Sequence, residues 1–129
     1  MRSHGFTLIE VLIVISIIAI LLAIAIPSYQ GVIRRGQATA AQSHNQVVRL
    51  AVQQWLGFNP ARSAATLSGT DCAQPTTLGT SGATSGYVQG TLGWPAPRGS
   101  VTCSLQGSGR TFSVTTAGGG KTYVNGAEQ

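Results

Sequence analysis

Few residues of this 129-residue chain could do acid–base or metal chemistry. No combination of its histidines and cysteines has the spacing of a zinc site. Paired-carboxylate enzymes and calcium or magnesium sites need clustered oxygens, and the acids here lie far apart along the chain. We therefore expect no enzymatic activity, no metal and no cofactor. The residues in question are Glu10, Asp71, Glu128, His4, His44, Cys72 and Cys103.

Glu10 is the single charged residue in an apolar run of 21 residues from Phe6 to Ile26. At about 1.5 Å per residue, a helix of this length spans roughly 30 Å, the thickness of a bilayer's hydrocarbon core. An acid inside such a segment is by default a functional group with a partner. Two simpler interpretations are a signal peptide cut after Ala25 and a plain membrane anchor. Both leave Glu10 without a role.

Glu10 belongs to the motif Gly5-Phe6-Thr7-Leu8-Ile9-Glu10, which is preceded by a short basic stretch. The motif continues into the long apolar run and Pro27. These residues resemble the N-terminus of a type IV pilin precursor, of the type IVa kind, with a leader that ends at Gly5. Type II secretion pseudopilins share this segment. The resemblance is close up to Gln30, and beyond it the chain is similar to the family only in layout.

The resemblance implies that a prepilin peptidase cleaves between Gly5 and Phe6 and N-methylates Phe6. It also implies that the new amino group of Phe6 pairs with Glu10 of a neighbouring subunit in an apolar filament core. Either charge alone is costly there and the pair much less so, so the pairing would fix the axial register between subunits. Within a single chain, the alternative is that Glu10 is protonated in the membrane.

We therefore expect a structural pilin subunit that assembles helix-to-helix into a homo-oligomeric type IV pilus. The resemblance implies a precursor in the bacterial inner membrane, partners in the pilus assembly machinery there, and a cell-surface pilus after assembly. Cell adhesion and motility are typical uses of such filaments. DNA contact is a weaker expectation, because basic charge is thinly spread and Arg34-Arg35 is the only basic pair.

Two alternatives stay open. The first is a minor pilin or a type II secretion pseudopilin, although the calcium site usual in the major pseudopilin looks absent from these acids. The second is a monomeric membrane-anchored binding module, for which Glu10 would be dispensable.

The chain divides into five expected segments. One helix from Phe6 to Leu56 is predicted, with a kink at Pro27, because proline removes a helical hydrogen bond. In its second half, apolar residues at spacings of three and four predict a buried stripe formed by Val47, Val48, Ala51, Val52, Trp55 and Leu56. His44 on this helix is expected to face solvent or another subunit. The segments are a leader 1–5, a transmembrane or filament-core helix 6–27, an amphipathic helix 28–57, a loop-rich connection 58–99 and an antiparallel sheet 100–129.

Beyond Gly99 the apolar pattern switches to a period of two, which predicts a meander of three antiparallel strands packed on the helical stripe. The strands are expected at Val101–Leu105, Phe112–Thr115 and Lys121–Val124. Tyr87-Val88 is a weaker strand candidate, and 93–97 reads as a turn. In an exported chain, Cys72 and Cys103 are expected to form a disulfide. The expected fold class is α+β, a long helical spine with a small antiparallel meander and one disulfide.

Overall fold

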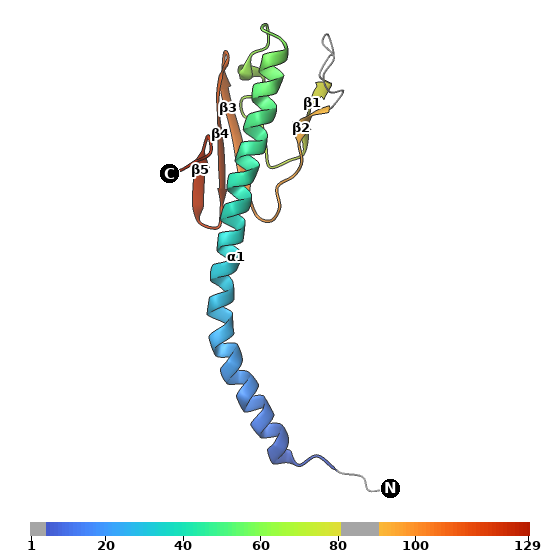
Figure 1. The fold of residues 1–129 in the computed structure, drawn as a ribbon, viewed down its shortest axis with the longest axis vertical. Coiled ribbons are helices and arrows are strands. Elements are labelled where there is room, and N and C mark those ends of the chain that lie inside the picture. Colours follow the sequence, from blue (N-terminus) through green and yellow to red (C-terminus); the bar gives the residue numbers. More distant parts are fainter. Residues whose placement is uncertain (1–4, 81–90) are drawn as a thin grey trace. The chain divides into compact units, whose positions relative to one another are not determined.

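The computed structural model describes residues 5–80 and 91–129 (Figure 1). The chain forms two compact units, Met1–Ile33 and Arg34–Gln129, and the boundary lies within the helix α1. Within the described residues, the elements follow one another as α1 (Leu8–Phe58), the 3-10 turn η1 (Ala64–Leu67), β1 (Thr76–Thr80), β2 (Thr91–Trp94), β3 (Thr102–Ser108), β4 (Thr111–Gly118), β5 (Lys121–Val124) and β6 (Ala127–Glu128).

The described part of the first unit is the N-terminal half of α1 and the residues before it. This half carries apolar side chains all round, and none of them is buried. The hydroxyl of Ser16 donates to the Leu12 carbonyl at 2.7 Å. This bond gives the hydroxyl a partner within the helix, so it needs no water in apolar surroundings. The helix continues through Pro27. A kink at Pro27 stays a prediction.

The second unit contains the expected meander. β3, β4, β5 and β6 pair in sequence order, and every pairing is antiparallel. The three predicted strands are confirmed, and β6 is an addition that the sequence pattern did not reveal. The β5–β6 connection is the two-residue turn Asn125-Gly126, with φ of 51° and 88°. Asn-Gly is the residue pair that such a left-handed hairpin turn favours.

The segment expected to be loop-rich contains a second, two-stranded sheet. β1 and β2 pair antiparallel from Thr76↔Trp94 to Thr80↔Thr91, with an irregularity between Thr77 and Gly79. Gly93 and Trp94, expected in a turn, belong to β2. A Cβ at position 93 would collide with the backbone of Thr76, so glycine here permits close strand pairing. The strand candidate Tyr87-Val88 lies outside the described residues.

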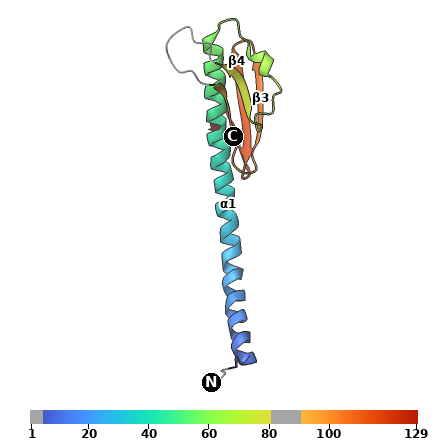
Figure 2. The same cartoon turned by 90° about the vertical axis from the view of Figure 1, so that its right-hand side faces the viewer.

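The four-stranded sheet lies along the second half of α1 (Figures 1 and 2). The core between them is built from aliphatic side chains that are fully buried: Val48, Val52, Leu105 and Val114. The predicted stripe on the helix is confirmed for four buried residues, Val48, Ala51, Val52 and Leu56. Trp55 is half-buried. Val47 is an exception, with 41% of its surface exposed. It lies about 100° around the helix from Val48, which carries it out of the sheet-facing stripe.

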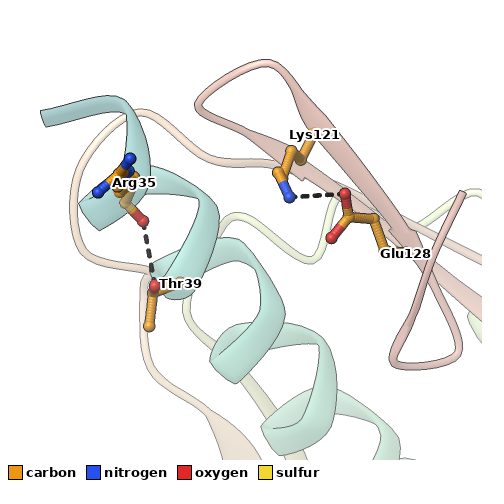
Figure 3. A network of polar contacts seen from close by, with 4 residues as sticks. All are labelled: Arg35, Thr39, Lys121 and Glu128. Atoms are coloured by element: carbon orange, nitrogen blue, oxygen red, sulfur yellow. Dashed lines mark hydrogen bonds and ion pairs between the residues drawn. The ribbon is translucent and has the colours of Figure 1, made fainter. Parts of the chain in front are cut away.

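The last hairpin is closed by an ion pair on the surface. Lys121 Nζ on β5 lies 2.6 Å from Glu128 Oε1 on β6 (Figure 3). The hydrogen bond to Glu128 raises the pKa of Lys121. Figure 3 also shows Thr39 on α1, whose hydroxyl donates to the Arg35 carbonyl at 3.0 Å. Within residues 5–80 and 91–129, Lys121–Glu128 is the only ion pair.

Candidate functional site

The start of α1 places Glu10 in the first helical turn. The backbone N–H groups of Glu10 and Val11 donate to the Thr7 carbonyl at 3.1 and 3.4 Å. The Thr7 hydroxyl lies 3.5 Å from Glu10 Oε2, at the limit of a hydrogen bond. A carboxylate near a helix N-terminus is favoured by the unpaired N–H groups there. Among the described residues, Glu10 has no cationic partner.

The N-terminal half of α1 after Glu10 presents a long, exposed apolar surface. An 18-residue window of α1 reaches a mean hydropathy of 3.2, and none of it is buried. Leu8 is 82% exposed and Ile24 is 67% exposed. Among the described residues α1 is the one helix long and apolar enough to cross a membrane. A surface of this size needs lipid or other apolar helices around it, because water disfavours so much exposed hydrocarbon.

The disulfide predicted from the sequence is confirmed. Cys72 and Cys103 are bonded across 31 positions of the chain, and both side chains are buried in the core cluster. The bond ties the segment after η1 to strand β3. The backbone reinforces this link, because Leu105 N–H donates to the Thr70 carbonyl at 3.2 Å and Gly69 N–H donates to the Leu105 carbonyl at 2.8 Å.

The expectation for His44 was wrong. Only 5% of this side chain is exposed, and Nε2 donates to the Cys72 carbonyl at 2.7 Å. Helical periodicity puts position 44 beside Val48 on the face that packs against the rest of the unit. The sequence alone did not reveal this role of His44, because its acceptor, the Cys72 carbonyl, lies 28 positions further along the chain. Only folding brings the two residues together.

Asn45 forms a second buried link that the sequence did not reveal. Its Nδ2 lies 2.8 Å from the Val114 carbonyl, 3.2 Å from Thr116 Oγ1 and 3.2 Å from the Tyr123 carbonyl. The Thr116 hydroxyl in turn donates to the Ala41 carbonyl at 2.9 Å. Asn45 Oδ1 is buried without a partner among the described residues. These polar contacts fix the register of α1 on β4 and β5, which aliphatic packing alone specifies less sharply.

Two arginines cover the end of α1. Arg62 Nη1 donates to the Trp55 carbonyl at 2.9 Å, and its guanidinium lies 4.9 Å from the centre of the Trp55 ring. Arg110 Nη2 donates to the Leu56 carbonyl at 3.2 Å. The last carbonyls of a helix lack intrahelical partners, and cationic donors are favoured there. The described residues hold no cluster of three His, Cys, Asp or Glu side chains that could bind a metal ion.

The comparisons with known proteins begin with the segment around Glu10. Residues 1–26 match the family model described as the prokaryotic N-terminal methylation motif. A type IV major fimbrial protein FimA of Dichelobacter nodosus is 50% identical over 51 residues, which are 40% of this chain and 33% of that protein. A probable minor fimbrial protein of the same organism is 46% identical over 55 residues, 43% of this chain and 35% of that protein.

A fimbrial protein of Pseudomonas aeruginosa is 49% identical over 51 residues, 40% of this chain and 33% of that protein. The chain thus spans about a third of the length of the relatives it matches. No solved structure matches the chain significantly. The methylation motif and the fimbrial relatives support the resemblance to type IV pilins. The residues that the family model matches, 1–26, contain Gly5, Phe6 and Glu10.

Proposed function

We propose that this chain is a type IV pilin, a structural and non-enzymatic subunit that packs helix-to-helix into a surface filament. One observation carries the proposal. The chain has a 21-residue apolar run, Phe6–Ile26, that is helical from Leu8 onward and has no buried residue. This run lies within residues 1–26, which match the methylation motif. A surface of this kind can be covered first by lipid and then by the same surface of neighbouring subunits.

The processing chemistry follows from the same segment. A prepilin peptidase would cleave between Gly5 and Phe6 and methylate the new amino group. Gly5 is exposed and has open space around its Cα, which suits entry of an extended chain into a protease active site. Phe6 is 77% exposed, so its amino group would be free to meet Glu10 of another subunit. The pair would neutralise two charges that are each costly in an apolar core.

Before assembly, the precursor would reside in the bacterial inner membrane, where its partners are the peptidase and the pilus assembly machinery. After assembly, the second unit would coat a cell-surface pilus. The absence of a clustered basic stripe in the sequence keeps direct DNA binding a weaker expectation.

A second candidate is a minor pilin, and one observation favours it. Relatives named probable minor fimbrial protein match this chain about as well as those named major fimbrial protein. The two candidates differ in how many copies each filament contains, and not in chemistry at Phe6 or Glu10.

The first experiment is intact-mass measurement and N-terminal sequencing of this protein in filaments sheared from the cell surface. A chain that begins at methylated Phe6 supports the pilin proposal, and its abundance relative to other filament proteins separates major from minor pilin. A chain that begins after Ala25, or a full-length chain confined to membranes, would contradict the proposal.

A further inference from the structure

A cleft in the second unit lies between α1 and the start of β4. Its lining combines basic, amide, hydroxyl and aromatic side chains around a space of about 250 Å³. The cleft exists because β5 pairs only with Thr115–Gly118 of β4 and leaves the first residues of β4 without a neighbour on that side. The lining residues are Arg49, Gln53, Arg110, Thr111, Phe112 and Asn125.

The two arginines of the cleft carry positive charge that no carboxylate neutralises. The sequence contains only three acids, and all of them lie in the described part of the chain. Glu128 pairs with Lys121, and neither Asp71 nor Glu10 forms an ion pair with a described residue. Arg49 and Arg110 therefore face the cleft without a carboxylate partner among the described residues.

Neutral carbonyl groups hold both guanidiniums in place. Arg49 Nη1 donates to the Asn125 carbonyl at 2.5 Å. Arg110 Nη1 donates to the Pro60 carbonyl at 3.1 Å and Nη2 to the Leu56 carbonyl at 3.2 Å. A guanidinium has five N–H donors, so these bonds leave donors on each arginine for a ligand. Both groups are oriented in advance, which lowers the entropic cost of binding.

The strand edge adds further polar groups. Val114 N–H donates to Asn125 Oδ1 at 3.0 Å, and the Val114 carbonyl accepts from Asn125 N–H at 2.9 Å. Peptide groups alternate sides along a strand, so the N–H and carbonyl of Phe112 face the same edge as those of Val114. Asn125 is the last residue that pairs with this edge of β4, through Val114. The N–H and carbonyl of Phe112, further along the same edge, therefore face the cleft.

We propose that this cleft binds an acidic sugar residue through its carboxylate. The fork of one guanidinium matches the geometry of a carboxylate, and the positive charge of the second arginine adds attraction for an anion. Gln53, Thr111 and Asn125 provide the mixed donors and acceptors that ring hydroxyls need. The half-buried Phe112 provides an apolar wall for the C–H face of a sugar.

The size of the cleft supports the same ligand class. About 250 Å³ is below the ~300–1,000 Å³ of pockets for drug-sized molecules, so the cleft accommodates a group of monosaccharide size. Single-stranded nucleic acid instead uses a basic groove that follows the backbone over several nucleotides. The cleft belongs to the second unit, so the proposal does not depend on filament formation.

The test is an NMR titration of the isotope-labelled full-length chain in detergent micelles with sodium glucuronate at constant ionic strength. We expect saturable shifts of the signals of Arg49, Gln53 and Phe112, and much smaller shifts with glucose. Absence of saturable shifts would overturn the proposal. Inorganic phosphate binding as tightly as glucuronate would also overturn it, because the cleft would then recognise an anion without the sugar.

Gln53→Glu is the variant of choice, because the Gln53 side chain is exposed and lines the cleft. The added carboxylate should lower glucuronate affinity about fivefold or more by pairing with the arginines and repelling the ligand. Gln54→Glu is the matched control, with the same charge change at an exposed position outside the cleft lining, and should retain the original affinity. Equal effects of the two variants would contradict the assignment to this cleft.

Discussion

His44 on α1 donates a 2.7 Å hydrogen bond to the carbonyl oxygen of Cys72, the residue whose sulfur is bonded to Cys103. One residue thus connects the helix to the segment that the disulfide ties to the sheet. The contact is buried, so water cannot replace it when one partner is removed. Within the second unit, the contact links the second half of α1 to the segment that follows η1.

Replacing His44 with alanine should lower the free energy of unfolding of the second unit by about 1–3 kcal/mol, because the Cys72 carbonyl loses its buried donor. For a unit of this size, each kcal/mol corresponds to a decrease in melting temperature of about 4–8 °C. The measurement is thermal unfolding of the full chain in detergent micelles by near-ultraviolet circular dichroism, which reports on Trp55 and Trp94. Gln42→Ala, on the exposed face, is the control. Equal melting temperatures for both variants would show that the contact adds no stability.

Replacing both Cys72 and Cys103 with serine should lower the stability by about 3–4 kcal/mol in the chain-entropy model for a loop of this length. The same near-ultraviolet melting experiment measures the effect. Dithiothreitol should lower the melting temperature of the original chain and leave that of the double variant unchanged. If the reductant has no effect on the original chain, the disulfide does not contribute to stability.

Gly119→Ala tests a close approach between the β4–β5 turn and the backbone of α1. Gly119 has φ of 62°, and a Cβ there would fall inside van der Waals contact with the Arg34 carbonyl oxygen. Both the left-handed backbone and the collision disfavour alanine. We expect a clearly lower melting temperature and a displaced β4–β5 turn.

Gly120→Ala separates the two causes. Gly120 has φ of 82°, and a Cβ there would have no heavy atom within 4 Å apart from its own neighbours. It should show only the backbone cost of about 1–2 kcal/mol, and Gly119→Ala should cost roughly 1–3 kcal/mol more because of the overpacking. If the variants melt at the same temperature, the turn moves away from α1 at no cost.

Glu10→Ala should leave cleavage before Phe6 intact and strongly reduce the amount of sheared filament. The expected reason is an unpaired Phe6 amino group in an apolar environment, which costs several kcal/mol. Intact mass of the membrane-bound protein measures processing, and immunoblotting of sheared material measures assembly. Thr7→Val is the control, because it removes only the weak Thr7–Glu10 contact of 3.5 Å. Abundant filaments from Glu10→Ala would contradict the pairing.

Much of the architecture was readable from local patterns. The apolar run predicted the first half of α1, and the spacing of three and four predicted the stripe of Val48, Val52 and Leu56. The period of two predicted the meander. Such patterns are visible because each depends on neighbours a few positions apart. With only two cysteines, the chain also allowed only one intramolecular bridge, and Cys72–Cys103 is formed.

Other features were not readable for a shared physical reason. β1 is composed of Thr, Leu and Gly without regular apolar alternation, so the β1–β2 sheet left no clear pattern. The buried hydrogen bonds of His44 and Asn45 left no local pattern either, because their acceptors lie 28 to 78 positions away in the sequence.

The sequence by itself thus determined the apolar N-terminal segment with Glu10, the long helix and the meander, because hydrophobic periodicity is a local property. The tertiary structure decided that His44 is buried and where Asn45 binds. It also decided that Arg49 and Arg110 share one cleft. Those outcomes depend on which distant backbone groups meet each side chain, and only the packing of α1 against the sheet brings them together.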